Sequence, residues 1–266
     1  MYLEIKNIHK FFGTGENRAE VLKGINCDIE KGSICVLLGP SGSGKSTLLN
    51  IIGGIETAEE GSISINGDTI ENMNEKQLSL YRRKHLGYVF QSYNLIPNLT
   101  VRENIEVGAY LSDNPLNVDD LMKTLGLYEH RNKIPNQLSG GQQQRTSIGR
   151  AIVKNPDILL CDEPTGALDY HTSKEILKLI GDVNQKYGNT VIMVTHNPEL
   201  ADKYSTRIVK LLDGKIIDDS APFSDEDEAK ESEEAYAPRK TSMSVFTAFS
   251  LSFNNLLTKK GRTLLT

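Results

Sequence analysis

Gly39-Pro40-Ser41-Gly42-Ser43-Gly44-Lys45-Ser46-Thr47 is the stretch that decides the fold of this 266-residue chain. It follows an apolar run at residues 33–38 and precedes a helical pattern that begins at Leu48. The pattern Gly-x4-Gly-Lys-Ser between a buried strand and a helix lets successive backbone amides face phosphate oxygens. In this pattern Lys45 adds positive charge at the β- and γ-phosphates, and the Ser46 hydroxyl ligates Mg²⁺. The stretch therefore predicts a loop that binds Mg-ATP, a Walker A motif.

A second motif agrees with the first. Four apolar residues at 158–161 lead directly into Asp162 and Glu163. A buried strand that delivers Asp162 to its carboxyl end is a Walker B arrangement, in which this carboxylate holds the metal or its water shell. Glu163 lies one residue further, where it can act as a general base on an attacking water. The alternative is a strand that ends in ordinary solvated acids, and the nearby phosphate loop disfavours it.

The composition excludes several classes of protein. The net charge is −5, and the 35 acidic and 30 basic residues are interspersed, so no nucleic-acid-binding face is expected. Cys27, Cys35 and Cys161 lie inside apolar runs without metal-ligand spacing, which indicates reduced core residues of a cytosolic protein. No stretch reaches the roughly 20 apolar residues that span a bilayer.

Strand and helix patterns alternate along the chain. The expected strands are residues 2–8, 21–29, 33–38, 87–91, 158–161 and 190–194, with a hairpin-like stretch at 61–67. Strands that alternate with crossover helices, such as the helical run at 173–185, predict a parallel sheet. The mostly helical periodicity of residues 92–154 predicts an inserted helical subdomain.

The character of the chain changes near its carboxyl end. Residues 1–220 are expected to form the globular domain, and residues 221–240 an acidic, solvated linker. Residues 241–266 are expected to form an amphipathic helix with apolar residues at helical spacing and a basic cluster. These are Val245, Phe249, Phe253, Leu256 and Leu257, followed by Lys259, Lys260 and Arg262.

Leu138-Ser139-Gly140-Gly141-Gln142, between the two Walker motifs, decides the family. With its surroundings this pentapeptide closely resembles the nucleotide-binding domains of ABC transporters, over about residues 2–217. The Asn-Lys-x-Asp motif of GTPases is absent. The resemblance implies an α/β fold, with a P-loop NTPase (RecA-like) core, an antiparallel β subdomain and the inserted helical subdomain.

The resemblance also implies roles for single residues. Phe12 matches the aromatic residue that stacks on adenine, although Phe11 is its neighbour. Gln91 matches the Q-loop glutamine that meets Mg²⁺ and senses the permease, and His196 matches the switch histidine at the γ-phosphate. The implied nucleotide contacts are Phe12, Gly39, Pro40, Ser41, Gly42, Ser43, Gly44, Lys45, Ser46, Thr47, Ser139, Gly140, Gly141, Gln142 and Asp169. The implied catalytic residues are Glu163, His196, Gln91 and Lys45, and the implied Mg²⁺ ligands are Ser46, Gln91 and Asp162. His9, His85, His130 and His171 are expected to be ordinary surface residues.

The family's signature motif acts on the nucleotide of an opposite subunit, through the positions matched by Ser139 and Gly141. The resemblance therefore implies that two copies stack head to tail with two ATP molecules between them. A lone domain would bind ATP but hydrolyse it poorly.

Three stretches, at residues 91–97, 135–145 and 163–169, resemble the macrolide-exporter, lipoprotein-release and antimicrobial-peptide-resistance group. In that group an amphipathic helix precedes the first membrane span. We therefore expect an ATPase half fused to a permease in the natural protein, at the cytoplasmic face of the membrane. The alternative is that residues 241–266 pack on their own domain.

Two other functions are compatible with a cassette of this kind. Soluble ABC ATPases of translation or DNA repair usually carry two cassettes or a long coiled coil, and neither pattern is present. A degenerate, regulatory cassette would bind ATP without turnover. The intact catalytic positions argue against it, so the sequence predicts a transport-coupled ATPase.

Overall fold

The computed structural model describes residues 2–221 of the chain. The expected amphipathic helix at 241–266 and all but the first residue of the expected linker at 221–240 lie outside the described residues. The fold below is that of the first of two units, Met1–Pro222.

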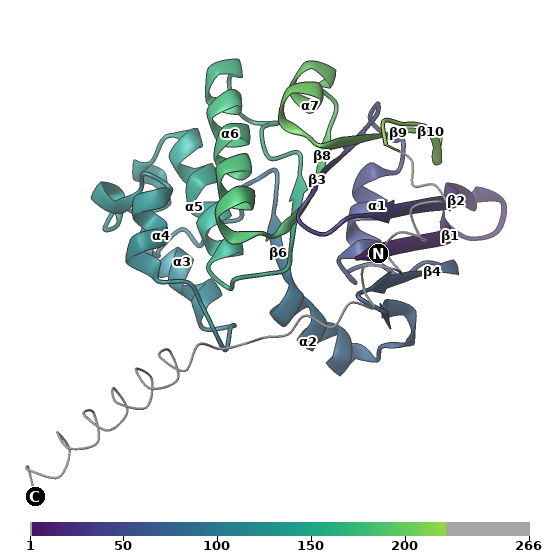
Figure 1. The fold of residues 1–266 in the computed structure, drawn as a ribbon, viewed down its shortest axis with the longest axis horizontal. Helices are drawn as coiled ribbons and strands as arrows, with labels where there is room; N and C mark the ends of the chain where they lie inside the picture. The colour runs from purple at the N-terminus through teal and green to yellow at the C-terminus, as the bar shows by residue number, and fades with distance from the viewer. Residues whose placement is uncertain (1, 222–266) are drawn as a thin grey trace, which may run out of the picture. The chain divides into compact units, whose positions relative to one another are not determined.

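The central sheet has six strands in the order β10-β9-β3-β8-β7-β6 (Figure 1). The strands are β3 (Ile34–Leu38), β6 (Leu86–Val89), β7 (Ile158–Asp162), β8 (Thr190–Thr195), β9 (Arg207–Leu212) and β10 (Lys215–Asp219). All neighbours pair in parallel except β10, which pairs antiparallel with β9. The predicted parallel sheet is confirmed.

The strands β3 and β8 are buried along their whole length because both faces of this sheet are covered. Cys35 and Leu37 of β3 belong to one apolar cluster, and Ile34, Val36 and Leu38 belong to a second cluster on the opposite face. This alternation explains why the sequence shows a continuous apolar run here instead of an alternating pattern.

An antiparallel sheet of four strands lies beside the central sheet, as the resemblance implied. Its order is β2-β1-β4-β5, with β1 (Leu3–Phe12), β2 (Ala19–Ile29), β4 (Glu60–Ile65) and β5 (Asp68–Thr69). The first strand runs to Phe12, four residues beyond the predicted end at Ile8, because β1 pairs with β2 along this length through several register shifts.

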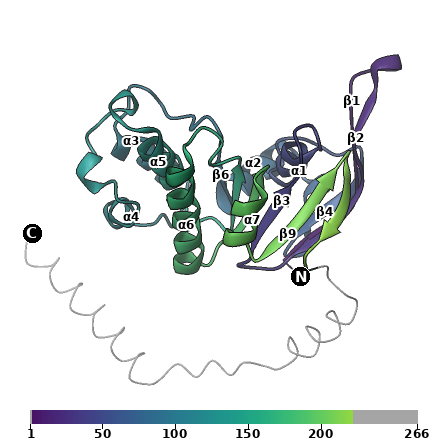
Figure 2. The same ribbon diagram turned by 90° about the horizontal axis from the view of Figure 1, so that it is seen from above.

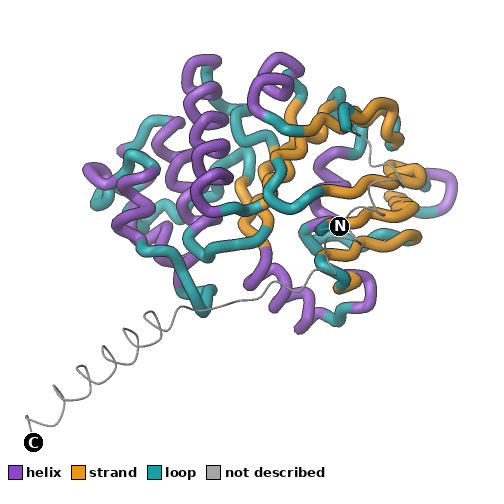
Figure 3. The backbone as a smooth tube through the Cα atoms, in the orientation of Figure 1, coloured by secondary structure: helices purple, strands orange, loops and turns teal. Residues whose placement is uncertain are grey.

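Seven α-helices occur in the described residues. They are α1 (Lys45–Ile52), α2 (Glu75–His85), α3 (Val101–Ala109), α4 (Val118–Thr124), α5 (Gly140–Ile152), α6 (Tyr170–Tyr187) and α7 (Pro198–Tyr204), with short 3-10 helices η1 (Gly15–Asn17), η2 (Ile70–Asn72), η3 (Tyr128–His130) and η4 (Pro135–Gln137). The helices α3, α4 and α5 gather on one side of the central sheet, so the stretch expected to be helical forms one group (Figures 1 and 3).

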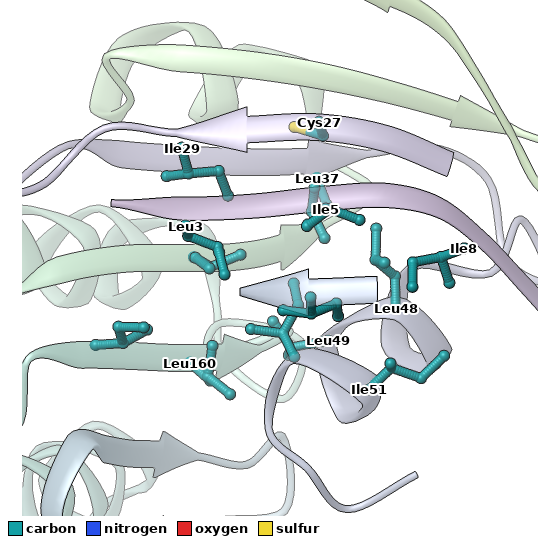
Figure 4. Packing of buried hydrophobic residues seen from close by; sticks show 14 of the residues in the cluster. Leu3, Ile5, Ile8, Cys27, Ile29, Leu37, Leu48, Leu49, Ile51 and Leu160 are labelled. Carbon is teal, nitrogen blue, oxygen red and sulfur yellow. The ribbon is translucent and has the colours of Figure 1, made fainter. Parts of the chain in front are cut away.

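The helix α1 packs between the two sheets and fixes the position of the loop before it. Its residues Leu48 and Leu49 are 1% and 0% exposed. Figure 4 shows them close to Ile5 and Ile8 of the antiparallel sheet. Leu160 of β7 belongs to the same cluster, so the phosphate loop is anchored through α1 to both sheets.

The three cysteines are buried and free, which confirms their prediction as core residues.

Within residues 2–221, no helix combines the length and apolar character needed to cross a membrane.

The loop between β6 and α3 is held by one buried side chain. Asn104 is 0% exposed, and its Oδ1 accepts a hydrogen bond from the backbone N–H of Ile96 at 2.8 Å. Its Nδ2 donates to the carbonyl oxygens of Leu99 at 2.9 Å and Thr100 at 3.0 Å. Asn104 therefore satisfies several backbone groups that have left the regular hydrogen-bond ladders.

We predict that Asn104→Ala lowers the free energy of unfolding by about 2–4 kcal/mol, because it leaves more than one buried backbone group without a partner. Urea unfolding measures the change. The exposed Asn114 is the matched control, and Asn114→Ala should change stability by less than about 0.5 kcal/mol. Equal effects of the two substitutions would contradict this account of the loop.

Candidate functional site

The predicted phosphate loop joins β3 to α1, and two of its glycines have left-handed backbone conformations. Gly42 has φ 80° and Gly44, the residue before α1, has φ 96°. A Cβ atom on Gly44 would also lie 2.6 Å from Leu22 Cδ2 and 3.0 Å from Val21 O of β2. Gly44 is therefore required both by its backbone conformation and by the close approach of the antiparallel sheet.

Lys45 curls back over this loop. Its ammonium group donates a hydrogen bond to the carbonyl oxygen of Pro40 at 2.7 Å and lies 3.4 Å from Ser43 Oγ. Burial lowers the pKa of Lys45 below its ordinary value, while the nearby carboxylates of Glu163 and Asp162 act in the opposite direction. The loop amides, the start of α1 and this ammonium group thus form one positive site suited to phosphate.

Asp162 is the last residue of β7 and faces the start of α1. The Ser46 hydroxyl donates a hydrogen bond to Asp162 Oδ1 at 2.8 Å. Burial raises the pKa of Asp162 above its ordinary value, against the hydrogen bond from Ser46. The two predicted metal ligands are thus brought together from positions 116 residues apart.

The donor set fits a hard divalent cation. A hydroxyl, a carboxylate and the amide of Gln91 offer oxygen atoms, which Mg²⁺ prefers, and Mg²⁺ is commonly bound by one or two carboxylates plus phosphates and water. Within the described part of the chain, no group of three or more His, Cys, Asp or Glu side chains could hold a metal ion. The oxygen donors of Ser46, Asp162 and Gln91 suit a cation whose other ligands are phosphate oxygens and water.

Glu163 follows in an unusual backbone conformation. Its φ is 45°, which non-glycine residues rarely adopt. Its N–H donates to Val194 O at 3.1 Å, and its carbonyl accepts from Gly166 N at 3.0 Å. This tight turn directs the side chain out of the sheet, where His196 Nδ1 lies 3.5 Å from Glu163 Oε1.

Gln91 lies beside this carboxylate. A Cβ atom on Gly166 would be 2.8 Å from Gln91 Nε2 and 3.3 Å from Glu163 Oε2, so both side chains face the same small space. The predicted strand at 87–91 was too long at this end, because β6 stops at Val89. Phe90 and Gln91 leave the sheet as the chain turns towards Tyr93, which has φ 57°.

The predicted residues Gln91, Glu163 and His196 follow β6, β7 and β8, and Asp162 ends β7. These three strands are neighbours in the central sheet. The carboxyl ends of parallel strands share one edge, which is where nucleotides bind in open α/β sheets. The structure therefore brings the predicted catalytic residues to one place beside the phosphate loop.

The structure distinguishes Phe12 from Phe11. Lys10 pairs with Leu22 on the adjacent strand, and paired residues share a face of the sheet. Leu22 packs against Gly44, so this face looks towards the phosphate loop. Phe12 lies two residues after Lys10 and shares that face. It is 42% exposed, with the Lys10 ammonium 5.2 Å from the centre of its ring.

Phe11 points to the opposite face. The guanidinium group of Arg18 covers its ring at 4.1 Å from the ring centre. The geometry therefore favours Phe12 as the aromatic residue available to a nucleotide base.

The signature motif begins α5. Ser139 Oγ accepts a hydrogen bond from Gln142 N at 3.3 Å, and Gln142 Oε1 accepts one from Ser139 N at 3.0 Å. This capping box satisfies backbone donors at the start of the helix. Because Ser139 Oγ accepts from the helix, its own hydrogen remains able to donate outward.

The helices α5 and α1 pack on opposite faces of the central sheet. Ile148 and Ile152 of α5 belong to one apolar cluster, whereas Leu49 and Ile52 of α1 belong to the other. Figures 1 and 2 both show β6 between these two helices. The signature motif and the phosphate loop of one chain are therefore carried by helices on different sides of the sheet.

Asp169, the other predicted nucleotide contact, caps α6. Its carboxylate accepts hydrogen bonds from Thr172 N at 3.0 Å and Thr172 Oγ1 at 2.6 Å. These bonds hold the pKa of Asp169 below its usual range. The carboxylate is thus committed to the helix start within its own chain.

Arg150 is a residue for which the sequence predicts no role. Its guanidinium group donates to Asn94 O at 2.5 Å and Tyr93 O at 3.0 Å, and so joins α5 to the loop after Gln91. Both loop residues have left-handed backbone conformations. No local pattern marks this contact, because the partners are 56 and 57 residues apart.

A cavity of about 350 Å³ lies elsewhere, at the amino-terminal ends of the central strands. Its lining includes Tyr2, Lys31, Tyr81, His85 and Asp157, and none of the predicted site residues.

Comparison with known proteins agrees with this geometry. A family model described as "ABC transporter" matches residues 22–166. The putative ABC transporter ATP-binding protein MG065 homolog of Mycoplasma pneumoniae is 46% identical over 217 residues, covering 80% of this chain and 46% of that protein. The bacitracin export ATP-binding protein BceA of Halalkalibacterium halodurans is 44% identical and covers 80% of this chain and 86% of its own.

The macrolide export ATP-binding/permease protein MacB of Neisseria meningitidis serogroup B is 40% identical over 274 residues, covering 99% of this chain and 42% of MacB. The chain thus spans less than half the length of the MG065 homolog and of MacB. Among solved structures, the ATP-binding cassette MJ0796, a dimer in a post-hydrolysis state bound to ADP and Pi, matches with a TM-score of 0.75. It is 37% identical, and the match covers 84% of this chain and 99% of that chain.

We predict that Phe12→Ala weakens ATP binding about tenfold or more, because stacking of a base on an aromatic side chain contributes about 1–3 kcal/mol. Phe11→Ala is the matched control and should leave the dissociation constant within about twofold of the unmodified value. Equilibrium titration with a fluorescent ATP analogue measures both. A larger loss for the Phe11 variant would reverse the assignment.

Proposed function

Because this chain belongs to the ABC transporter family and is an ATP-binding ATPase domain, we propose that two copies pair head to tail around two ATP molecules and drive a membrane permease. The observation that supports the pairing is the position of the signature motif. It caps a helix on the opposite face of the sheet from α1, so a second copy would supply the Ser139 that completes each site. The dimer of MJ0796 with ADP and Pi is a relative in which paired cassettes occur with the products of hydrolysis.

Within one chain, the phosphate loop would bind the triphosphate. The loop amides and Lys45 would hold the β- and γ-phosphate oxygens, and Phe12 would stack on the base. Ser46, Asp162 and Gln91 would hold Mg²⁺, which when bound neutralises charge on the phosphates. The remaining polar groups then act on the attacking water.

Glu163 would accept the proton of that water. Its carboxylate projects from the turn after β7, and His196 Nδ1 lies 3.5 Å from it. The imidazole ring of His196 would both contact the γ-phosphate and orient the Glu163 carboxylate. The strained backbone at Glu163 is the kind of feature that folded structures retain at functional sites.

The opposite copy would contribute the start of its α5. The Ser139 hydroxyl can donate to the γ-phosphate while it accepts from Gln142, and the helix adds partial positive charge at this end. Groups supplied by a partner are worth about 10³–10⁵ in rate in other NTPases. Cleavage of the terminal phosphate would remove the bridging contact and release the pair.

The permease partner is proposed from the relatives. MacB, whose printed name includes both an ATP-binding part and a permease, aligns with 99% of this chain. We propose that residues 1–220 form the cassette, that 221–240 form a linker and that 241–266 lead towards a permease in the same natural chain. The cassette would then work at the cytoplasmic face of the membrane.

We predict that Glu163→Gln yields a stable dimer in the presence of Mg-ATP, since the bridging γ-phosphate is no longer removed. Gel filtration of the 266-residue chain with and without Mg-ATP measures this. A variant that elutes only as a monomer at saturating Mg-ATP would exclude the head-to-tail mechanism.

We predict that Lys45→Ala reduces ATP binding or turnover to background, because the ammonium group is the charged part of the phosphate loop. Release of inorganic phosphate by the chain measures turnover, and the exposed Lys203 provides a control as Lys203→Ala. If the Lys45 variant hydrolysed ATP at the unmodified rate, the assignment of this loop as the phosphate-binding site would be wrong.

A further inference from the structure

His130 was expected to be an ordinary surface residue, but the structure gives it a partner in the signature motif. Its ring is partly buried, and Nε2 lies 3.0 Å from Nε2 of the Gln142 side chain. Gln142 is the residue whose amide oxygen closes the capping box on Ser139.

The hydrogen bonds determine which atom donates. The amide oxygen of Gln142 accepts from Ser139 N at 3.0 Å, so the amide nitrogen must face His130. That nitrogen carries two hydrogens and cannot accept. His130 Nε2 is therefore the acceptor of this hydrogen bond.

The loop that carries His130 is itself fixed. The backbone of His130 is bonded on both sides, from its N–H to Leu127 O at 2.8 Å and from Lys133 N to its carbonyl at 2.9 Å. The first N–H groups of α3 donate to this loop, from Val101 to Lys133 O at 2.8 Å and from Arg102 to Arg131 O at 3.0 Å. The loop satisfies the exposed donors of α3 and cannot shift without freeing them.

We propose that His130 is a positioning residue for the signature motif. By accepting a hydrogen bond from Gln142, it fixes the orientation of the amide that holds Ser139 at the start of α5. Without this acceptor the amide can rotate, the capping box opens, and the Ser139 hydroxyl loses its fixed direction. The role concerns the site completed by the second copy, so it rests on the proposed function.

The first test needs no dimer. His130→Leu removes the acceptor, whereas His130→Gln places an amide oxygen at about the same reach. Amide hydrogen exchange of Ser139 and Gln142, measured by NMR on the nucleotide-free chain, should accelerate about tenfold in the Leu variant and return to the unmodified rate in the Gln variant. Equal exchange in all three proteins overturns the proposal.

The second test measures the consequence for catalysis. In the Leu variant, kcat for ATP should fall about tenfold, since a displaced reacting group is costly, while ATP binding to the single chain stays within about twofold. In the Glu163→Gln background, His130→Leu should weaken Mg-ATP-dependent dimer formation, and His130→Gln should restore it. A Gln variant as impaired as the Leu variant would show that the ring shape matters and not the acceptor, and overturns the proposal.

His85 supplies a matched control. It is also a half-buried histidine whose ring nitrogen contacts a side chain, Asp157 at 2.5 Å, but it lies at the amino-terminal end of β6. His85→Leu should leave kcat within about twofold. If the unmodified chain shows neither turnover nor Glu163→Gln dimers, the proposed function fails. If both are normal and only His130→Leu is without effect, the failure belongs to this inference alone.

Discussion

The close packing of Gly44 against β2 is the constraint on which the rest of the site depends. The antiparallel sheet presses so near to the phosphate loop that a single added carbon would lie 2.6 Å from Leu22 Cδ2. This contact, together with the buried leucines of α1, fixes the start of that helix between two sheets. The position of Lys45 and Ser46 follows from the position of this helix start. Phe12, on β1, lies on the face of the antiparallel sheet that looks towards the phosphate loop.

Beside the phosphate loop, several predicted site residues lie where the chain turns away at the ends of the central strands. The central sheet supplies one edge, and the side chains of Gln91, Glu163 and His196 follow the points where the chain leaves its strands. Glu163 turns out of β7 with φ 45°, and the chain after Gln91 turns with φ 57° at Tyr93. Regular strands alone would keep these side chains within the layers of the fold. In the proposed mechanism the residues at these irregular positions would act on the attacking water, and the sheet provides their spacing.

Most of the fold, and the elements that carry the predicted site residues, could be predicted from the sequence because their signals are local. The phosphate loop, the apolar strand before Asp162 and the signature motif are each contiguous. The helix α2 was not predicted, since Leu78 and Tyr81 are its only buried residues and its last turn is basic. The bonds of Arg150 and of His130 were also missed. Each joins residues that are distant in sequence or unrelated in periodicity, so only the packed structure reveals them.

The helix α5 joins two regions that would take part in the proposed cycle, the signature motif and the loop after Gln91. Its first turn presents Ser139, and Arg150 near its last turn grips the backbone after Gln91. A helix that is bonded at both ends moves as a rigid body, so a tilt at one end also moves the other end. If a membrane partner displaced that loop, the start of α5 would move with it. The direction of the Ser139 hydroxyl towards the neighbouring copy's nucleotide would then change.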